Sequence, residues 1–330
     1  MRRRWAVAAT VALLLSGCTG EDSPDPGPAT AAPSASPTTT TAPPAAPSAT
    51  PPAAGPTPRA SPDDVRVDTA MAAVRHLAGR VGPRPGTSPA YFRAVRWVES
   101  RLTGLGWAVE RQSFPAPAGF SQAGPTEGLP VAGGRSVNVI ATRGDVVPGQ
   151  PWLLVGAHLD TVPTAPGAED NASGIGVLLA TAEALAGHRT RLPVVLVAFG
   201  AEEPRGPGDA HHYGSTAYVA ALSPAQRGSL QGMVALDRVG VGTAVPLGSV
   251  EAGDPLRAEV ERAARRAAVP VVTETGQESS DHFSFVQEGL PGVRLGSTPY
   301  AGYHSAQDVP SVVDAAQLGR TARIVVAWLR

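Results

Sequence analysis

Two histidines and three acidic residues in the second half of the chain match, in type and number, what two zinc ions sharing one carboxylate require. These residues are His158, Asp170, Glu203, Asp237 and His304. Imidazole and carboxylate groups bind Zn²⁺ without cysteine, and metals in a two-metal site lie ~3.5 to 4 Å apart. A water between such ions becomes a hydroxide at neutral pH. The five residues therefore predict a centre for metal-assisted hydrolysis.

Such a centre also needs a base that does not bind metal, to move a proton from the water to the leaving group. Glu202 is adjacent to Glu203, and neighbouring residues just past a strand point in different directions, so the pair can supply both a base and a ligand. Asp160 follows His158 by two residues and is placed to accept the second imidazole N–H and fix its tautomer. We therefore expect catalytic roles for Glu202 and Asp160.

The elements that must position these residues alternate between strand and helix patterns. The short apolar runs 152–157 and 192–199 are typical of strands buried on both faces, and the Ala- and Leu-rich segment 172–185 between them predicts a crossover helix. A strand, helix, strand unit implies parallel strands covered by helices. Ligands in such sheets collect at the carboxyl ends of the strands, so the acidic residues and histidines are expected to converge there.

The same patterns continue along the chain. Helices are also expected at 65–77, 89–105, 255–268 and 313–329, and strands at 107–114, 136–142, 233–236, 269–273 and 292–295. The sequence thus predicts an α/β fold in one domain, residues 63–330, with a mixed, mostly parallel sheet sandwiched between helices. Taken alone, a histidine after a strand is more often a packed or surface residue, and an acidic pair is usually solvated. The prediction of a site depends on their joint placement at strand ends.

Charge argues against nucleic acid as a partner. The chain of 330 residues carries a net charge of −1, and its 27 basic residues, all arginine, form no long basic run. We expect a monomer.

The N-terminus has the features of an export signal. Three arginines precede an apolar run that is too short to span a bilayer comfortably, and Leu15-Ser16-Gly17-Cys18 resembles the lipobox of bacterial lipoproteins. Residues 1–17 are expected to be removed and Cys18, the only cysteine, to be lipidated, which excludes disulfides from the body. Residues 18–62 then form a disordered Pro-, Ala-, Ser- and Thr-rich tether that reaches on the order of 100 Å. This places the protein outside the cytoplasm, anchored to the outer face of a bacterial membrane, or secreted if the signal is an ordinary one.

Five motifs resemble the metal-site motifs of the two-zinc aminopeptidase family that includes bacterial leucine aminopeptidase and yeast aminopeptidase Y. The order of the motifs and the 12-residue step from His158 to Asp170 also match, and the resemblance covers about residues 65 to 330. The motifs are Gly156-Ala157-His158-Leu159-Asp160-Thr161, Glu169-Asp170-Asn171-Ala172-Ser173-Gly174, Phe199-Gly200-Ala201-Glu202-Glu203, Leu236-Asp237 and Tyr303-His304-Ser305.

The resemblance implies a place for each ligand of two Zn²⁺ ions. His158 and Asp237 would bind one ion, Glu203 and His304 the other, and Asp170 would bridge them. The family also holds its bridging aspartate through a cis peptide bond to the next residue, so the bond from Asp170 to Asn171 is expected to be cis.

The same resemblance implies a reaction. A zinc-bridged hydroxide would attack the scissile carbonyl of a peptide with a free N-terminus, with Glu202 as general base and Tyr303 as a donor to the oxyanion. Arg238 departs from the family, which usually has an apolar residue there, so the wall of the substrate pocket is expected to differ.

Three further histidines lie near the motifs. We interpret His211 and His212 as loop or helix-start residues and His282 as a residue beside the pocket, and none of them as a metal ligand.

Alternatives to an aminopeptidase remain on the same scaffold. Related enzymes include carboxypeptidases and glutaminyl cyclases, and a non-catalytic binding lipoprotein is a third possibility. A complete ligand set favours two metals and hydrolysis, and a retained base, Glu202, argues against a protein without catalysis. A carboxypeptidase would want arginines for the substrate carboxylate, and the sequence alone does not place Arg238 or Arg294 in such a patch.

Overall fold

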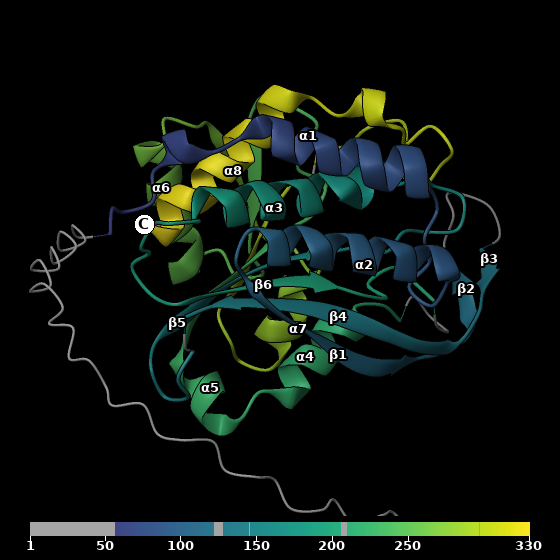
Figure 1. Cartoon of the computed structure of the whole chain (residues 1–330), viewed down its shortest axis with the longest axis horizontal. Coiled ribbons are helices and arrows are strands. Elements are labelled where there is room, and N and C mark those ends of the chain that lie inside the picture. The colour runs from purple at the N-terminus through teal and green to yellow at the C-terminus, as the bar shows by residue number, and fades with distance from the viewer. Residues whose placement is uncertain (1–56, 122–127, 145, 206–209, 297) are drawn as a thin grey trace, which may run out of the picture. The chain divides into compact units, whose positions relative to one another are not determined.

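The computed structural model describes residues 57–330 except 122–127, 145, 206–209 and 297, and eight strands of these residues form one sheet (Figure 1). In spatial order the strands are β1 (Ala108–Ala116), β4 (Gly134–Arg143), β6 (Val194–Phe199), β5 (Trp152–His158), β7 (Leu230–Leu236), β10 (Gly292–Leu295), β8 (Val245–Gly248) and β9 (Val271–Glu274). The two central strands β6 and β5 are buried along their whole length, as their continuous apolar sequences predict.

The direction of the strands confirms the predicted mixed, mostly parallel sheet. The four strands β6, β5, β7 and β10 run parallel to one another, and β8 pairs parallel with β9. The pairs β1 with β4, β4 with β6, and β10 with β8 are antiparallel. The four parallel strands end at the same edge of the sheet, where loops carry the predicted site residues.

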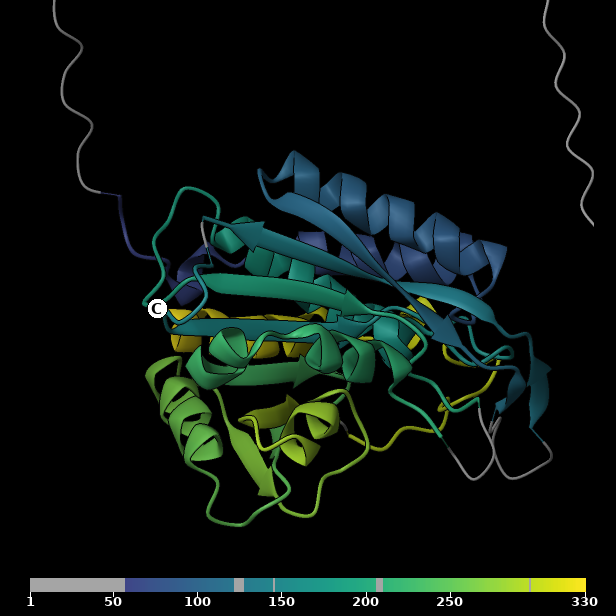
Figure 2. The same ribbon diagram turned by 90° about the horizontal axis from the view of Figure 1, so that it is seen from below.

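Helices cover both faces of the sheet, as expected. Figure 1 and Figure 2 show α1 (Val67–His76), α2 (Pro89–Gly104), α3 (Gly174–Ala184) and α8 (Ala315–Leu329) on one face, where α6 (Pro255–Arg266) packs against α8. On the other face lie α4 (Tyr213–Ala221), α5 (Pro224–Ser229) and α7 (His282–Gln287). Almost every residue of α3 is buried, because this helix packs against α1, α8 and β5.

Local sequence signals set the ends of the longer helices. Ser88, Asp254 and Asp314 are the N-caps of α2, α6 and α8, and each side chain accepts a hydrogen bond from a backbone N–H of the first turn. After α2 the chain turns at Gly106, whose φ of 82° favours glycine.

The structure contains elements that the sequence did not predict. β8 was missed because Pro246 and Gly248 interrupt a four-residue segment, and α4, α5 and α7 are too short to show a clear helical period. A two-stranded sheet of β2 (Gly119–Ser121) and β3 (Leu129–Val131) was also missed. The predicted helix at 172–185 begins at Gly174, after an irregular turn, η3 (Ala168–Ser173).

The predicted signal peptide, Cys18 and the tether up to residue 56 lie outside the described residues. The folded domain begins slightly before the predicted boundary at residue 63. Ala60 is buried, and its N–H donates a hydrogen bond to the carbonyl of Arg189. Within the described ranges, no helix has both the length and the apolar character needed to cross a bilayer.

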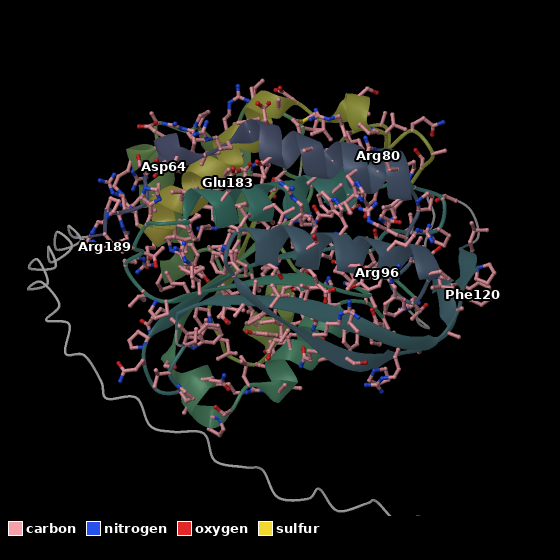
Figure 3. The ribbon with its side chains drawn as sticks, in the orientation of Figure 1. Asp64, Arg80, Arg96, Phe120, Glu183 and Arg189 are labelled. Atoms are coloured by element: carbon pink, nitrogen blue, oxygen red, sulfur yellow. The ribbon has the colours of Figure 1, made fainter. Side chains whose placement is uncertain are left out.

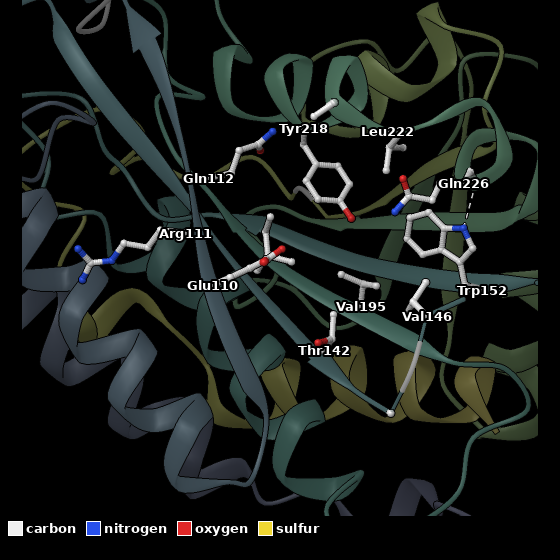
Figure 4. A pocket seen from close by; sticks show the side chains of 13 residues that line it. Glu110, Arg111, Gln112, Thr142, Val146, Trp152, Val195, Tyr218, Leu222 and Gln226 are labelled. Atoms are coloured by element: carbon white, nitrogen blue, oxygen red, sulfur yellow. Dashed lines mark hydrogen bonds between the residues drawn. The ribbon is translucent and has the colours of Figure 1, made fainter. Parts of the chain in front are cut away.

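A cavity of about 550 Å³ lies beside β1 and β4, under α4 and α5 (Figure 4). Trp152 and Tyr218 contribute apolar walls, and the Trp152 indole N–H donates a hydrogen bond to the carbonyl of Gln226. Of the described residues that line it, none is a histidine or cysteine and only Glu110 is acidic, so this cavity lacks the groups of a metal site.

Arg84 binds the loop that connects β5 to η3, and this loop joins the predicted ligands His158 and Asp170. Its fully buried guanidinium donates hydrogen bonds to the carbonyls of Leu159 (2.7 Å), Pro166 (2.7 Å) and Gly167 (3.0 Å). Five N–H donors in a rigid fork suit this task, which a lysine could not perform.

Replacing Arg84 should therefore destabilise the protein. We expect Arg84→Met to lower the free energy of unfolding by about 3 kcal/mol, because several buried carbonyls lose their donors. Urea unfolding of the purified protein measures the loss. Arg96→Met is the control, since Arg96 is exposed on α2 (Figure 3), and it should change stability by less than about 0.5 kcal/mol. Equal stability of the two variants would contradict this role for Arg84.

Candidate metal centre

The five predicted ligands lie together at the carboxyl edge of the sheet. His158 is the last residue of β5, Asp237 follows β7, and Glu203 lies in the loop after β6. Asp170 belongs to η3 and His304 to the loop before the short helix η5 (Pro310–Val312). All five side chains are buried.

Asp170 stands between the two histidines. One carboxylate oxygen, Oδ1, lies 3.1 Å from Nε2 of His158, and the other, Oδ2, lies 3.4 Å from Nε2 of His304. The same ring nitrogens approach Asp237 Oδ1 (3.5 Å) and Glu203 Oε2 (3.1 Å) respectively. The ligand atoms form two groups that share Asp170, and each group is compact enough to hold a metal ion.

Two zinc ions fit this set of donors. Oδ1 of Asp237 and Oε1 of Glu203 are buried and accept no hydrogen bond in the structure, although buried polar atoms normally have partners. The set contains only imidazole and carboxylate donors, which suit Zn²⁺. Asp170 is the residue that the two groups have in common.

The electrostatics of the site reflect opposite charges packed at short range. Burial opposes ionisation of Asp170, but the contacts with His158 and His304 outweigh it and lower the pKa of Asp170 well below its usual value. For His158, burial is outweighed by the charges of Glu202, Asp170 and Asp237, which raise its pKa well above the usual value. A cation is thus favoured between these carboxylates, and divalent ions supply the same charge when they bind.

Asp160 does not have the partner expected from the sequence. Its Oδ1 lies 3.9 Å from Nδ1 of His158, which is too far for a hydrogen bond. The carboxylate instead accepts hydrogen bonds from the backbone N–H groups of Glu202 (3.0 Å) and Glu203 (3.3 Å). Asp160 therefore positions the loop that carries the predicted base and one ligand, rather than the tautomer of the imidazole.

Glu202 is buried beside the ligands without belonging to either metal group. Its Oε2 is 3.9 Å from Nε2 of His158, and its Oε1 is 3.1 Å from Nε2 of His212. Burial raises the pKa of Glu202 to about 7, near the value at which a general base works at neutral pH. His212 was expected to begin a helix, and it is the N-cap of α4, but its contact with Glu202 was not predicted.

The residues on either side of Asp170 hold neighbouring loops through their side chains. Glu169 accepts hydrogen bonds from the backbone N–H groups of Gly240 and Val241. Asn171 donates to the carbonyl of Leu236 (2.8 Å), next to Asp237. The bond between Asp170 and Asn171 is cis, as the family resemblance predicted.

Gly174 is required where α3 begins. A Cβ atom at this position would lie 2.4 Å from Asn171 Oδ1 and 2.5 Å from the carbonyl oxygen of Leu236. Glycine therefore allows the start of α3 to lie close to the end of β7, where Asn171 donates its hydrogen bond to Leu236.

Left-handed backbone conformations concentrate around the site. Of the five described non-glycine residues with positive φ, four flank or belong to it: Ala201 (51°), His212 (61°), Arg238 (56°) and His304 (51°). Such conformations persist where surrounding contacts enforce them, and they cluster at functional sites.

A cavity of about 410 Å³ opens onto the ligands and contains several predicted site residues. Tyr303, His211 and Arg238 line it, and the ring of Tyr303 stacks on His304 at 3.8 Å. His282 is buried in α7, with Nε2 2.8 Å from the carbonyl oxygen of Gln277, and is not among the described lining residues.

Arg294 is a further site residue that sequence reasoning did not place. Its guanidinium is buried and lies 3.0 Å from Oδ2 of Asp237. This ion pair, with the contact to His158, lowers the pKa of Asp237 against the effect of burial. Arg294 lies in β10 and its partner Asp237 follows β7, so the contact depends on the pairing of these two strands, which the sequence does not reveal.

Comparison with known proteins identifies relatives of this chain. The chain is 28% identical over 241 residues to leupeptin-inactivating enzyme 1 of Streptomyces exfoliatus, which covers 70% of the chain and 49% of that protein. The chain spans less than half of the length of the curated relatives it matches.

Two kinds of solved enzyme share the fold. The zinc aminopeptidase BSAP of Bacillus subtilis aligns over 80% of this chain and 94% of its own, with a TM-score of 0.69 and 18% identity. A glutaminyl cyclase of Porphyromonas gingivalis aligns over 81% of this chain and 98% of its own, with a TM-score of 0.66 and 22% identity.

The family description "Peptidase family M28" matches residues 138–329, which is more than half of the chain and includes all five predicted ligands. The family resemblance predicted from the motifs is thereby confirmed. The chain belongs to peptidase family M28 and has the fold of its zinc aminopeptidases.

Proposed function

We propose that the protein is a two-zinc aminopeptidase that removes N-terminal residues from peptides outside the cytoplasm. The observation that carries the proposal is the position of Asp170, whose two carboxylate oxygens face separate histidines, each paired with one more acidic ligand. In this proposal His158 and Asp237 bind one ion, and Glu203 and His304 bind the other.

The side chains around the ligands supply the remaining functions of a hydrolase. Two bound zinc ions would activate a water molecule and polarise the scissile carbonyl. Glu202 takes a proton from the water and delivers it to the departing amine. It suits this role because it is buried close to the ligands and burial raises its pKa to about 7. Tyr303 lines the same cavity and donates its hydroxyl hydrogen to the carbonyl oxygen as negative charge develops. Asp160 holds the backbone of Glu202 in place.

Removing the base should reduce the rate far more than substrate binding. We expect Glu202→Gln to lower kcat by roughly 10²- to 10⁴-fold, since the amide keeps the shape but cannot accept the proton. The measurement is hydrolysis of a panel of aminoacyl amides by purified protein, with and without a zinc chelator. Glu251→Gln is the control, because Glu251 is exposed and lies outside the lining of the cavity.

The same panel separates an aminopeptidase from related enzymes. N-acetylated substrates should resist cleavage, and glutaminyl substrates should release glutamine rather than pyroglutamate. Activity that survives chelation or Glu202→Gln, a preference for blocked N-termini, or cyclisation of glutamine would each contradict the proposal.

The number of bound zinc ions should depend on whether the mutated residue belongs to one group of ligands or, like Asp170, to both. We expect about two zinc ions per chain in the wild-type protein, about one in His304→Ala, and nearly none in Asp170→Ala, since only Asp170 belongs to both groups. Elemental analysis after dialysis measures these contents, and circular dichroism checks that the variants fold. Equal metal loss in the two variants would argue against a shared carboxylate.

The proposed location rests on the sequence of the N-terminus. If Cys18 is lipidated, the wild-type protein should incorporate labelled palmitate and sediment with membranes, whereas Cys18→Ala should do neither. Ser23→Ala is the control. Membrane association of Cys18→Ala without label would favour another anchor, and secretion of unlabelled wild-type protein would indicate an ordinary cleaved signal.

A further inference from the structure

The cavity over the candidate metal centre is lined mainly by charged and polar side chains. Its described lining contains no leucine, isoleucine, valine, methionine or phenylalanine. The lining residues are His158, Asp170, Glu202, Glu203, Pro204, His211, Asp237, Arg238, Ser279, Tyr303 and His304. Charged and polar side chains thus surround the space next to the ligands, and they can bind a polar group of a substrate.

Two arginines approach Asp237, but only one of them faces the cavity. The side chain of Arg294 is 1% exposed, pairs with Asp237 Oδ2 at 3.0 Å, and donates to Ser279 Oγ at 2.8 Å. Arg294 is therefore engaged within the protein. Arg238 lines the cavity with a side chain that is 17% exposed.

The position of Arg238 is fixed while its guanidinium stays available. Its backbone N–H donates to Asn171 Oδ1 at 3.3 Å, and its φ of 56° is held in the left-handed region. The guanidinium lies over the ring of Tyr303, 4.5 Å from the centroid, and Nε is 3.9 Å from Asp237 Oδ1. No hydrogen bond joins this guanidinium to an acceptor among the described residues, so its N–H donors are free to bind a ligand.

Charge balance makes this arginine attractive to an anion. If the proposed zinc ions are bound, their positive charge offsets the charge of the ligand carboxylates Asp170, Glu203 and Asp237. The positive charge of Arg238 then remains in a partly enclosed cavity. Arginine forms paired hydrogen bonds with a carboxylate, and the planar contact with Tyr303 holds its guanidinium ready.

We propose that Arg238 is a specificity-determining residue that binds a carboxylate of the substrate within one residue of the scissile bond. This inference rests on the proposed peptidase function. Because Arg238 is next to the ligand Asp237, it reaches only groups close to the reacting carbonyl. Two sources supply such a carboxylate: the side chain of an N-terminal aspartate or glutamate, and the C-terminus of a dipeptide.

Matched substrate pairs test the inference and distinguish the two sources. Glutamyl and glutaminyl p-nitroanilides differ in the side-chain carboxylate, whereas leucyl-glycine and leucyl-glycinamide differ in the C-terminal one. For each pair, the ratio of kcat/KM for the acid to kcat/KM for the amide is measured in the wild-type protein, Arg238→Met, Arg238→Lys and Arg96→Met. Arg96, exposed on α2 (Figure 3), is the matched control.

We expect the wild-type protein to prefer the acid in one pair, which identifies the source. Arg238→Met should lower that ratio by about 10- to 100-fold, mainly through KM, because a charge-assisted contact is lost. Arg238→Lys should restore part of the preference, and Arg96→Met should leave it unchanged. In Arg238→Met, competitive inhibition should weaken together with this ratio. The inhibitor is free glutamate for a side-chain carboxylate and glycyl-glycine for a C-terminal one.

Two results would overturn the inference. One is a wild-type protein with no preference for the acid in either pair, and the other is an Arg238→Met variant in which both members of each pair lose kcat/KM equally. The second result would mean that Arg238 only supports Tyr303. Both results leave the proposed function intact, because hydrolysis of unblocked substrates persists. A wild-type protein that cleaves only N-blocked peptides would instead contradict the aminopeptidase itself.

Discussion

The candidate site depends on buried acidic side chains that accept hydrogen bonds from the backbone of neighbouring loops. Asp160 binds the N–H groups of Glu202 and Glu203, and Asp308 does the same for Glu169 and Asp170. Each of these carboxylates joins two loops that come from different parts of the sequence. Two of the predicted ligands, Asp170 and Glu203, are therefore positioned through their own backbone N–H groups.

Burying many carboxylates together has an electrostatic cost that the fold offsets with a few cations. Burial raises the pKa of Glu169 to about 8, and burial together with the charge of Asp170 raises the pKa of Glu203 to about 8. Arg84 and Arg294 are buried on either side of the ligands, and Arg294 pairs directly with Asp237. The ligand set brings three carboxylates together, and divalent cations bound there would offset their charge.

The sequence could predict that the five candidate ligands lie together because the ends of buried strands can be recognised from their apolar runs. The apolar runs of β5 and β6 predicted two buried neighbouring strands, and parallel strands bring their carboxyl ends to one edge of the sheet. His158 and Glu203 were therefore expected at that edge, and both line the cavity there. Contacts that depend on side-chain direction or strand order were not readable. The contact between His212 and Glu202, and the ion pair of Arg294, arise only after the sheet has formed. The prediction that Asp160 binds the imidazole of His158 was wrong, because a spacing of two residues in the sequence does not fix which neighbour a carboxylate faces.

The position of Arg238 connects substrate selection to the arrangement of the metal ligands. Its backbone is held by Asn171, which also binds Leu236 and follows the shared ligand Asp170. A change of the Arg238 side chain can therefore alter the cavity without moving Asp170, since the contacts that position Asp170 come from other side chains. A change at Asn171 cannot be confined in this way, because one amide supports both the wall of the cavity and the end of β7. We conclude that side chains facing the cavity can vary to suit a substrate, whereas Asn171 is constrained by both tasks.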